Sequence, residues 1–197
     1  MYRLLETIKI KNRLPQNIEN HNARMNRTRN ELFASSDSID LNNSIKIPGH
    51  LTNDVYKCRV IYSKKIEVVE FLPYTIKPVR TLQLVECDTL EYKYKYFDRT
   101  IFNELLQQTK CDDILIVKHN FITDTSYSNI VFFDGNKWIT PSTPLLKGTM
   151  REYLLQTGRL VEANITVNEL KLFKKAALIN SMIDLEESPF IEMHNIY

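Results

Sequence analysis

The sequence has no apolar run long enough to cross a lipid bilayer. It also lacks a secretory signal at its start, because charged residues follow almost at once and no cleavage site is present. We therefore expect a cytoplasmic protein with no membrane partner. The formal net charge of +2 is too small to favour a nucleic-acid partner.

Cysteines are also scarce. Cys58, Cys87 and Cys111 are odd in number and lack the spacing of metal ligands, so we predict no metal site. This usage favours a reducing compartment and ordinary thiols that are buried or partly buried. Internal repeats and low-complexity tracts are absent as well.

What remains is an ordinary globular composition, with 43% hydrophobic and 25% charged residues in a chain of 197. This length suits one compact domain or two small lobes. Helical and strand patterns are mixed without a strict βαβ rhythm, which predicts an α+β fold. We expect a small α/β lobe over residues 1–79, a linker over 80–88 and a large lobe over 89–197.

Periodicity and turn residues predict the individual elements. The expected strands cover residues 2–10, 55–62, 66–72, 82–86, 90–96, 114–118, 129–133, 138–140 and 176–183. The expected helices cover residues 17–33, 98–108 and 147–158, with a short one opening at Asn168. Asp98 is expected to cap the second helix, whose buried face would hold Ile101, Phe102, Leu105 and Leu106. Thr149 and Glu152 match a capping box, and Gly158 suits the end of that helix.

Two local patterns could carry chemistry. The helix start at Gly148, Thr149 and Met150 exposes backbone N–H groups that suit a phosphate, although every helix has such an end. Lys95 shares an expected strand face with Lys93, which would ordinarily indicate two solvated lysines. A catalytic lysine needs a depressed pKa, and a nearby cation such as Arg99 could lower it.

Two further groups of polar residues are open to more than one interpretation. Asp124 lies among hydroxyl residues, where it could cap a loop or be a buried carboxylate that needs a cationic partner. His21 and Arg24 lie near one another on the first expected helix and could equally form a solvated face.

Several segments together resemble the class IV aminotransferase family, whose members are fold type IV pyridoxal phosphate enzymes. His-Asn-Ala-Arg at residues 21–24 resembles its His-x-x-Arg helix. Phe-Ile-Thr-Asp-Thr-Ser-Tyr-Ser-Asn-Ile at 121–130 resembles its acid-containing loop before a strand. Thr-Pro at 140–141 and Leu-Lys-Gly-Thr-Met-Arg at 146–151 complete the series. Each motif alone is weak, but their order and spacing make the group specific.

The resemblance implies a two-lobed fold and a role for each candidate residue. Lys95 would bind pyridoxal 5'-phosphate covalently and move the Cα proton of the substrate. Asp124 would pair with the pyridine nitrogen and keep the ring protonated. Arg24 would bind the phosphate. The remaining residues expected to contact the cofactor are Arg99, Thr149, Met150 and Ser181.

Substrate handling is less well defined. Arg59 is the candidate for a substrate carboxylate, because a guanidinium binds carboxylates at two points; a half-exposed strand arginine is the alternative. The chain is shorter than typical members and begins almost at the Glu-Thr-Ile strand, so we expect the leading strand and a substrate-facing loop to be missing. Asp124 replaces the more frequent glutamate, and Ser128 precedes Asn129.

The residues after Lys95 favour one reaction. Tyr-Phe-Asp-Arg follows the lysine, which resembles the lyase members, whereas branched-chain aminotransferases more often have Asn-Tyr there. We expect a 4-amino-4-deoxychorismate lyase-like enzyme that acts on a small amino-bearing substrate. The alternatives are a branched-chain or D-amino-acid aminotransferase and a cofactor-binding protein with little catalysis. The resemblance also implies a homodimer.

Overall fold

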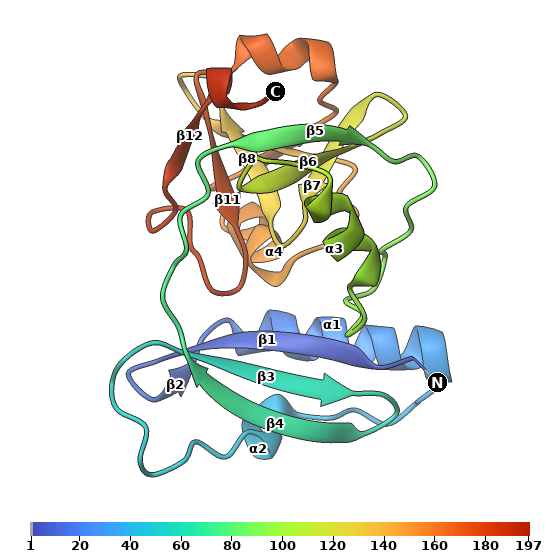
Figure 1. The fold of residues 1–197 in the computed structure, drawn as a ribbon. Helices are drawn as coiled ribbons and strands as arrows, with labels where there is room; N and C mark the ends of the chain where they lie inside the picture. The colour runs from blue at the N-terminus through green and yellow to red at the C-terminus, as the bar shows by residue number, and fades with distance from the viewer. Residues whose placement is uncertain (1) are drawn as a thin grey trace. The chain divides into compact units, whose positions relative to one another are not determined.

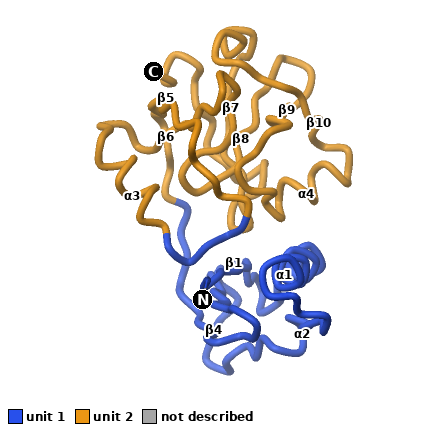
Figure 2. Tube along the Cα trace, turned by 90° about the vertical axis from the view of Figure 1, so that its right-hand side faces the viewer, with its two compact units in different colours: residues 1–76, 94–98 blue, residues 77–93, 99–197 orange. Residues whose placement is uncertain are grey.

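The computed structural model describes residues 2–197 and divides them into two compact units (Figure 2). The first unit extends to Ile76 and also includes Tyr94–Asp98, and the second contains Lys77–Lys93 and Arg99–Tyr197. The segment 80–88, expected to be a linker, contains a strand of the second unit. Within residues 2–197 no helix is both long and apolar enough to cross a membrane.

The first unit is an antiparallel sheet covered by one long helix (Figure 1). Its strands are β1 (Leu4–Lys11), β2 (Leu14–Pro15), β3 (Tyr56–Tyr62) and β4 (Ile66–Pro73), in the order β2-β1-β3-β4. Its helices are α1 (Ile18–Phe33) and the short α2 (Leu41–Ser44). The predicted strand, helix and hairpin are confirmed here. Alternate residues of β1 and β3 point to α1, and Leu4, Ile8 and Val60 pack with Met25 in the core.

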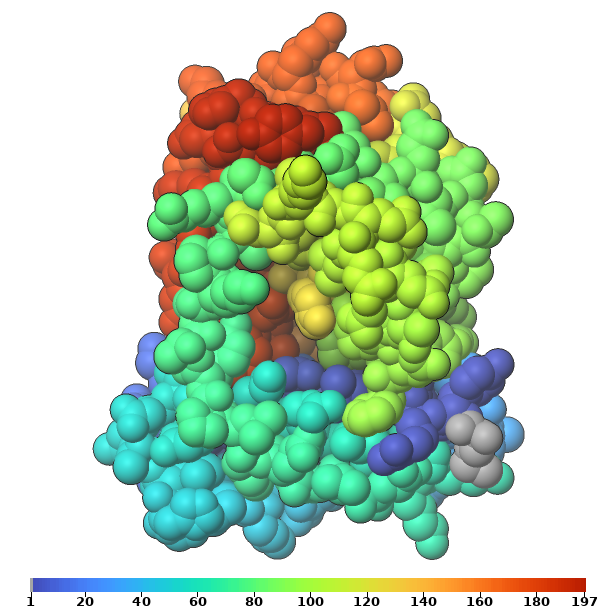
Figure 3. All heavy atoms as spheres, in the orientation of Figure 1, coloured from blue at the N-terminus to red at the C-terminus, as the bar shows by residue number. Residues whose placement is uncertain are grey.

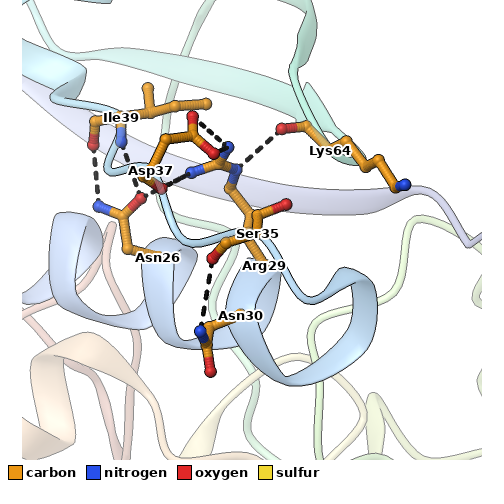
Figure 4. Close-up of polar contacts among 7 residues, drawn as sticks. All are labelled: Asn26, Arg29, Asn30, Ser35, Asp37, Ile39 and Lys64. Carbon is orange, nitrogen blue, oxygen red and sulfur yellow. Dashed lines mark hydrogen bonds and ion pairs between the residues drawn. The ribbon is translucent and has the colours of Figure 1, made fainter.

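The buried face of α1 is unusually polar. Arg29 is almost fully buried, and its guanidinium holds the carboxylate and the carbonyl oxygen of Asp37 and the carbonyl oxygen of Lys64 (Figure 4). The Asn26 side chain exchanges two hydrogen bonds with the backbone of Ile39. These contacts fasten the chain after α1 and the turn between β3 and β4 to the helix. Arg29 therefore has a structural explanation.

The second unit is built around an eight-stranded mixed sheet (Figure 1). Its strands are β5 (Leu82–Glu86), β6 (Asp113–Lys118), β7 (Phe121–Thr125), β8 (Asn129–Phe133), β9 (Trp138–Pro141), β10 (Val161–Ala163), β11 (Lys175–Ile179) and β12 (Phe190–Glu192). Its helices are α3 (Thr100–Gln107), α4 (Thr149–Gln156), η1 (Val167–Leu172) and η2 (Met193–Asn195). The order β10-β9-β8-β7-β6-β5 is a continuous path, and β11 pairs with both β8 and β12. Strands and helices are thus mixed in both units, which confirms the α+β prediction.

Residues 90–96 do not form the strand that their alternation predicts. Tyr92 is buried because its ring packs edge-on against Phe102, with centroids 4.7 Å apart. Within this segment, Tyr96 pairs with Leu4 in an isolated bridge. Lys93 and Lys95 therefore do not share a strand face, and that prediction is wrong.

Helix α3 also differs from its prediction. It begins at Thr100 with Arg99 in the cap position, so Asp98 is not the cap. Among the four residues of its expected buried face, Phe102 alone is buried, and Ile101 is exposed. The helix lies on the surface of the second unit, where most of its side chains meet solvent (Figure 3).

The capping box lies in a different helix from the one predicted. Gly148 occupies the cap position of α4 and makes no side-chain bond, which leaves Thr149 one position too late for that role. A complete capping box joins Thr166 and Glu169 at the start of η1 instead. The predicted end of α4 is confirmed, because Gly158 follows it with a φ of +70°.

Candidate functional site

Three charged or polar side chains meet under α1 in the first unit. Glu6 points to α1 because it shares the face of Leu4 and Ile8 on β1. Its carboxylate accepts hydrogen bonds from Arg24 Nε at 2.9 Å and Arg24 Nη2 at 2.5 Å. His21 Nδ1 lies 2.6 Å from the same carboxylate. The three side chains, which we call the Glu6 cluster, are all buried.

The Glu6 cluster carries no net charge at neutral pH. Burial raises the pKa of Glu6, but the Arg24 guanidinium and the His21 hydrogen bond outweigh it and bring the pKa to about 2. Burial lowers the pKa of His21 below its usual value, although Glu6 acts in the opposite direction. The carboxylate and guanidinium are therefore charged, and the imidazole is neutral. The solvated helix face considered for His21 and Arg24 is excluded, since both are buried.

Lys95 belongs to the same unit as this cluster. Its carbonyl oxygen accepts a hydrogen bond from Leu5 N–H at 2.9 Å, and Phe97 N–H donates to the carbonyl oxygen of Arg3 at 2.9 Å. The segment thus runs beside the start of β1. Lys95 is half-buried, and its charge helps to lower the His21 pKa, so the two side chains interact electrostatically. Lys93 is exposed and belongs to the second unit.

Arg59 also lies in the first unit, on β3. Its Nη1 donates to Glu70 at 2.5 Å, and its guanidinium is 5.7 Å from the centroid of the Phe97 ring. Glu70 is its cross-strand partner on β4. This pairing explains the arginine structurally, and its role toward a substrate stays a prediction.

Asp124 is the centre of a second buried group, in the second unit. It lies on β7 and not in a loop, because residues 121–125 pair with β6 and β8. One carboxylate oxygen accepts a hydrogen bond from Asn129 Nδ2 at 2.7 Å, and the other accepts one from Leu146 N–H at 2.9 Å. Asn129 Nδ2 also donates to the carbonyl oxygen of Leu146 at 2.9 Å. We call these three residues the Asp124 bracket.

The bracket fixes the loop before α4, and the pKa of its Asp124 carboxyl group is raised. Burial raises the pKa of Asp124 to about 6, although its hydrogen bonds and the Arg151 charge act in the opposite direction. A Cβ at position 148 would overlap the Asn129 side chain, so glycine is required where the chain passes Asn129. Asp124 thus holds a proton more readily than an exposed aspartate does.

Three other expected cofactor contacts of the second unit lie in α4 and in the turn after β11. Thr149 and Met150 are buried in the first turn of α4. Ser181 lies in a turn after β11, since that strand ends at Ile179 and not at 183 as predicted. Asn180, next to Ser181, donates to Ser128 Oγ at 2.9 Å, and Ser128 directly precedes Asn129.

Arg99 is bound within the second unit. It donates to the carbonyl oxygen of Ser126 and to Tyr92 Oη, and its guanidinium lies 4.4 Å from the centroid of the Tyr127 ring. These contacts tie the start of α3 to the end of β7. They give Arg99 a structural explanation. Its expected effect of lowering the pKa of Lys95 stays a prediction.

A cavity of about 470 Å³ also opens in the second unit, and none of the expected site residues lines it. Thr123 and Leu145, the neighbours of Asp124 and Leu146, are among its walls. The residues that sequence reasoning missed are Glu6 and Asn129. The motifs contained both of them, in the Glu-Thr-Ile strand and in the strand after the acid, but gave them no role.

Comparisons with known proteins agree with the motifs. The model of the family "Amino-transferase class IV" matches residues 92–185. An uncharacterised protein of Haemophilus influenzae is 40% identical over 185 residues, which are 92% of this chain and 98% of the relative. A Haemophilus somnus crystal structure, provisionally named a 4-amino-4-deoxychorismate lyase, is 32% identical with a TM-score of 0.87, over 94% of this chain and 98% of that one.

More distant structures share the fold. A hypothetical aminotransferase of Mycobacterium tuberculosis, solved with bound pyridoxal phosphate, is 15% identical with a TM-score of 0.75, over 99% of this chain and 81% of that one. This likeness supports the fold alone. The match to the family model and the two relatives above 30% identity go further, and we conclude that this chain belongs to the class IV aminotransferase family of fold type IV pyridoxal phosphate enzymes.

Proposed function

We propose that the protein binds pyridoxal 5'-phosphate and eliminates pyruvate from 4-amino-4-deoxychorismate to give 4-aminobenzoate. The observation that carries the cofactor is the Asp124 bracket. Its carboxylate is buried, and the hydrogen bonds that the described residues give it come from uncharged N–H groups, while the Arg151 charge acts on it without donating a hydrogen bond. A protonated pyridine nitrogen would supply the cation that such a carboxylate needs. The residues present therefore fit the cofactor.

The other roles follow the family motifs. Arg24 would hold the phosphate together with backbone groups of Thr149 and Met150 in the first turn of α4 and the hydroxyl group of Ser181 in the turn after β11. Lys95 would bind the cofactor aldehyde and then, once released, take the Cα proton from the substrate and return it. When bound, the cofactor supplies an electron sink for that deprotonation. Arg99 is proposed as a further cofactor contact and Arg59 as the anchor of a substrate carboxylate.

Two observations favour the lyase reaction. The Haemophilus somnus relative carries a provisional lyase name at 32% identity over nearly all of both chains. Tyr-Phe-Asp-Arg follows Lys95, as in the lyase members that the sequence resembles. Elimination of pyruvate balances without an amino acceptor, whereas transamination requires a 2-oxo acid. We further propose that the active form is a cytoplasmic homodimer.

One experiment separates the candidate reactions. We expect the purified protein with cofactor to release pyruvate and 4-aminobenzoate in equal amounts from 4-amino-4-deoxychorismate alone. Lys95→Arg is the inactive control, because it keeps a cation but cannot bind the aldehyde in the same way. Turnover only when a 2-oxo acid and an amino acid are supplied would indicate an aminotransferase. A visible absorption band that neither substrate class changes would indicate cofactor binding without catalysis.

A further inference from the structure

The Glu6 carboxylate fixes the plane of the Arg24 guanidinium. A guanidinium is a rigid planar fork, and a carboxylate that accepts from both Nε and Nη2 sets its orientation. The same carboxylate is held on its other side by His21 Nδ1. The contacts of Glu6 with Arg24 and with His21 therefore determine where the Arg24 guanidinium points.

This arrangement differs from that of the other buried arginine of α1. Arg29 binds a mostly exposed acid, Asp37, and also holds two backbone carbonyl groups, which is expected of an arginine that fastens loops. Glu6, in contrast, is fully buried, and the Arg24 side chain is 8% exposed. Burial of both charges costs free energy unless the geometry is good, so a buried pair is weak evidence for stability alone. A role in orienting Arg24 explains the buried position of Glu6 better than stability does.

We propose that Glu6 is a positioning residue for the cofactor phosphate and acts through Arg24. This inference rests on the proposed role of Arg24 in phosphate binding. Because Glu6 neutralises the guanidinium, phosphate recognition depends on donors held in a fixed direction and not on an excess of positive charge. His21 is the second anchor of the same carboxylate. Glu6 itself touches neither the cofactor nor the substrate.

The test compares two ligands that differ only in the phosphate. Pyridoxal and pyridoxal phosphate carry the same aldehyde and ring. The dissociation constant of pyridoxal divided by that of pyridoxal phosphate therefore isolates phosphate recognition. We measure this ratio by absorbance titration of the apoprotein. Glu6→Gln should lower it about tenfold, the size expected when a charge-assisted hydrogen bond is lost. In an Arg24→Gln background the same change should have little effect, because the two residues act as one unit.

Controls separate positioning from general stability. Asp37→Asn removes the acid partner of Arg29 on the same helix and should leave the ratio unchanged. Circular dichroism of each apoprotein reports folding, and Glu6→Asp, which keeps the charge but shortens the reach, replaces Glu6→Gln if that variant does not fold. An equal loss of affinity for both ligands in the Glu6 variants would overturn the inference. If Arg24→Gln leaves the ratio unchanged, the proposed role of Arg24 fails, and the inference fails with it.

Discussion

At the scale of single residues, Lys93 and Lys95, which lie two residues apart in the segment 90–96, make the cofactor assignment testable. Borohydride reduction of the protein with bound cofactor should place a phosphopyridoxyl group on Lys95. Lys93 is the matched control, since it lies two residues away but is exposed and belongs to the other unit. Peptide mass mapping locates the label. Recovery of the label on Lys93, or on no lysine, would refute the assignment.

Asp124 should matter for the cofactor more than other buried acids do. Asp124→Ala should weaken cofactor binding by on the order of 1.5–3 kcal/mol, the value of a hydrogen bond to a charged group, and remove nearly all turnover. Asp113→Ala is a suitable control, because Asp113 is also buried with a raised pKa and accepts from the Ile114 and Ser126 N–H groups, but it lies outside the family motifs. Spectrophotometric titration measures the cofactor affinity of both variants. Turnover of Asp124→Ala within about twofold of wild type would make it a structural residue only.

At the scale of elements, the start of α4 depends on the absence of a side chain at Gly148. Gly148→Ala would push the new Cβ into the Asn129 side chain and disturb the Asp124 bracket. We expect a loss of about 1–3 kcal/mol in the free energy of unfolding, as overpacking usually costs, together with weaker cofactor binding. Gly49→Ala is the control, because no atom lies within 4 Å of the added Cβ. Urea unfolding compares the two, and equal stabilities would contradict this explanation.

The sequence predicts elements well where one pattern dominates. The β3–β4 hairpin and α1 follow from alternation and from apolar residues at sevens, because each is decided by local spacing. Residues 90–96 alternate as well, yet Tyr92 packs on Phe102 and Tyr96 pairs with Leu4. Those contacts come from other parts of the chain, and alternation cannot report them.

The candidate site shows the same limit. Motif order nominates Lys95, Arg24 and Asp124, but gives no role to Glu6. An isolated glutamate in an alternating strand ordinarily indicates solvent exposure. Its burial depends on two partners supplied by a helix that begins well after the strand. Such a partner set becomes visible only when the helix is placed on the sheet.

At the scale of the whole molecule, acid should weaken the two units differently. The Glu6 pKa is lowered from 4.5 to about 2, so its contribution to stability is present above pH 4.5 and lost as the pH falls toward 2. This loss is on the order of 3 kcal/mol in the first unit. The Asp124 pKa is raised from 3.8 to about 6, so its contribution is present below pH 3.8 and lost as the pH rises through 6.

Hydrogen exchange can follow each unit separately. Between pH 5 and pH 3, we expect the protection factors of β1 and α1 to fall while those of β7 and β8 are maintained or rise. In Glu6→Gln the first unit should lose most of this pH dependence, because the titrating group is gone. Equal protection of β1 at both pH values in the wild type would show that the Glu6 cluster does not control acid stability.

The chain passes between the units three times, after Ile76, Lys93 and Asp98, and this has a consequence for synthesis on the ribosome. Tyr94 and Tyr96 pack against the core of the first unit, so a nascent chain that ends at Ile76 lacks part of that core. We therefore expect the first unit to complete its core only after Asp98 has emerged, when residues 77–93 of the second unit have already been synthesised. A fragment that ends at Ile76 would also lack Lys95, so we expect neither the complete first unit nor the proposed cofactor lysine in such a fragment.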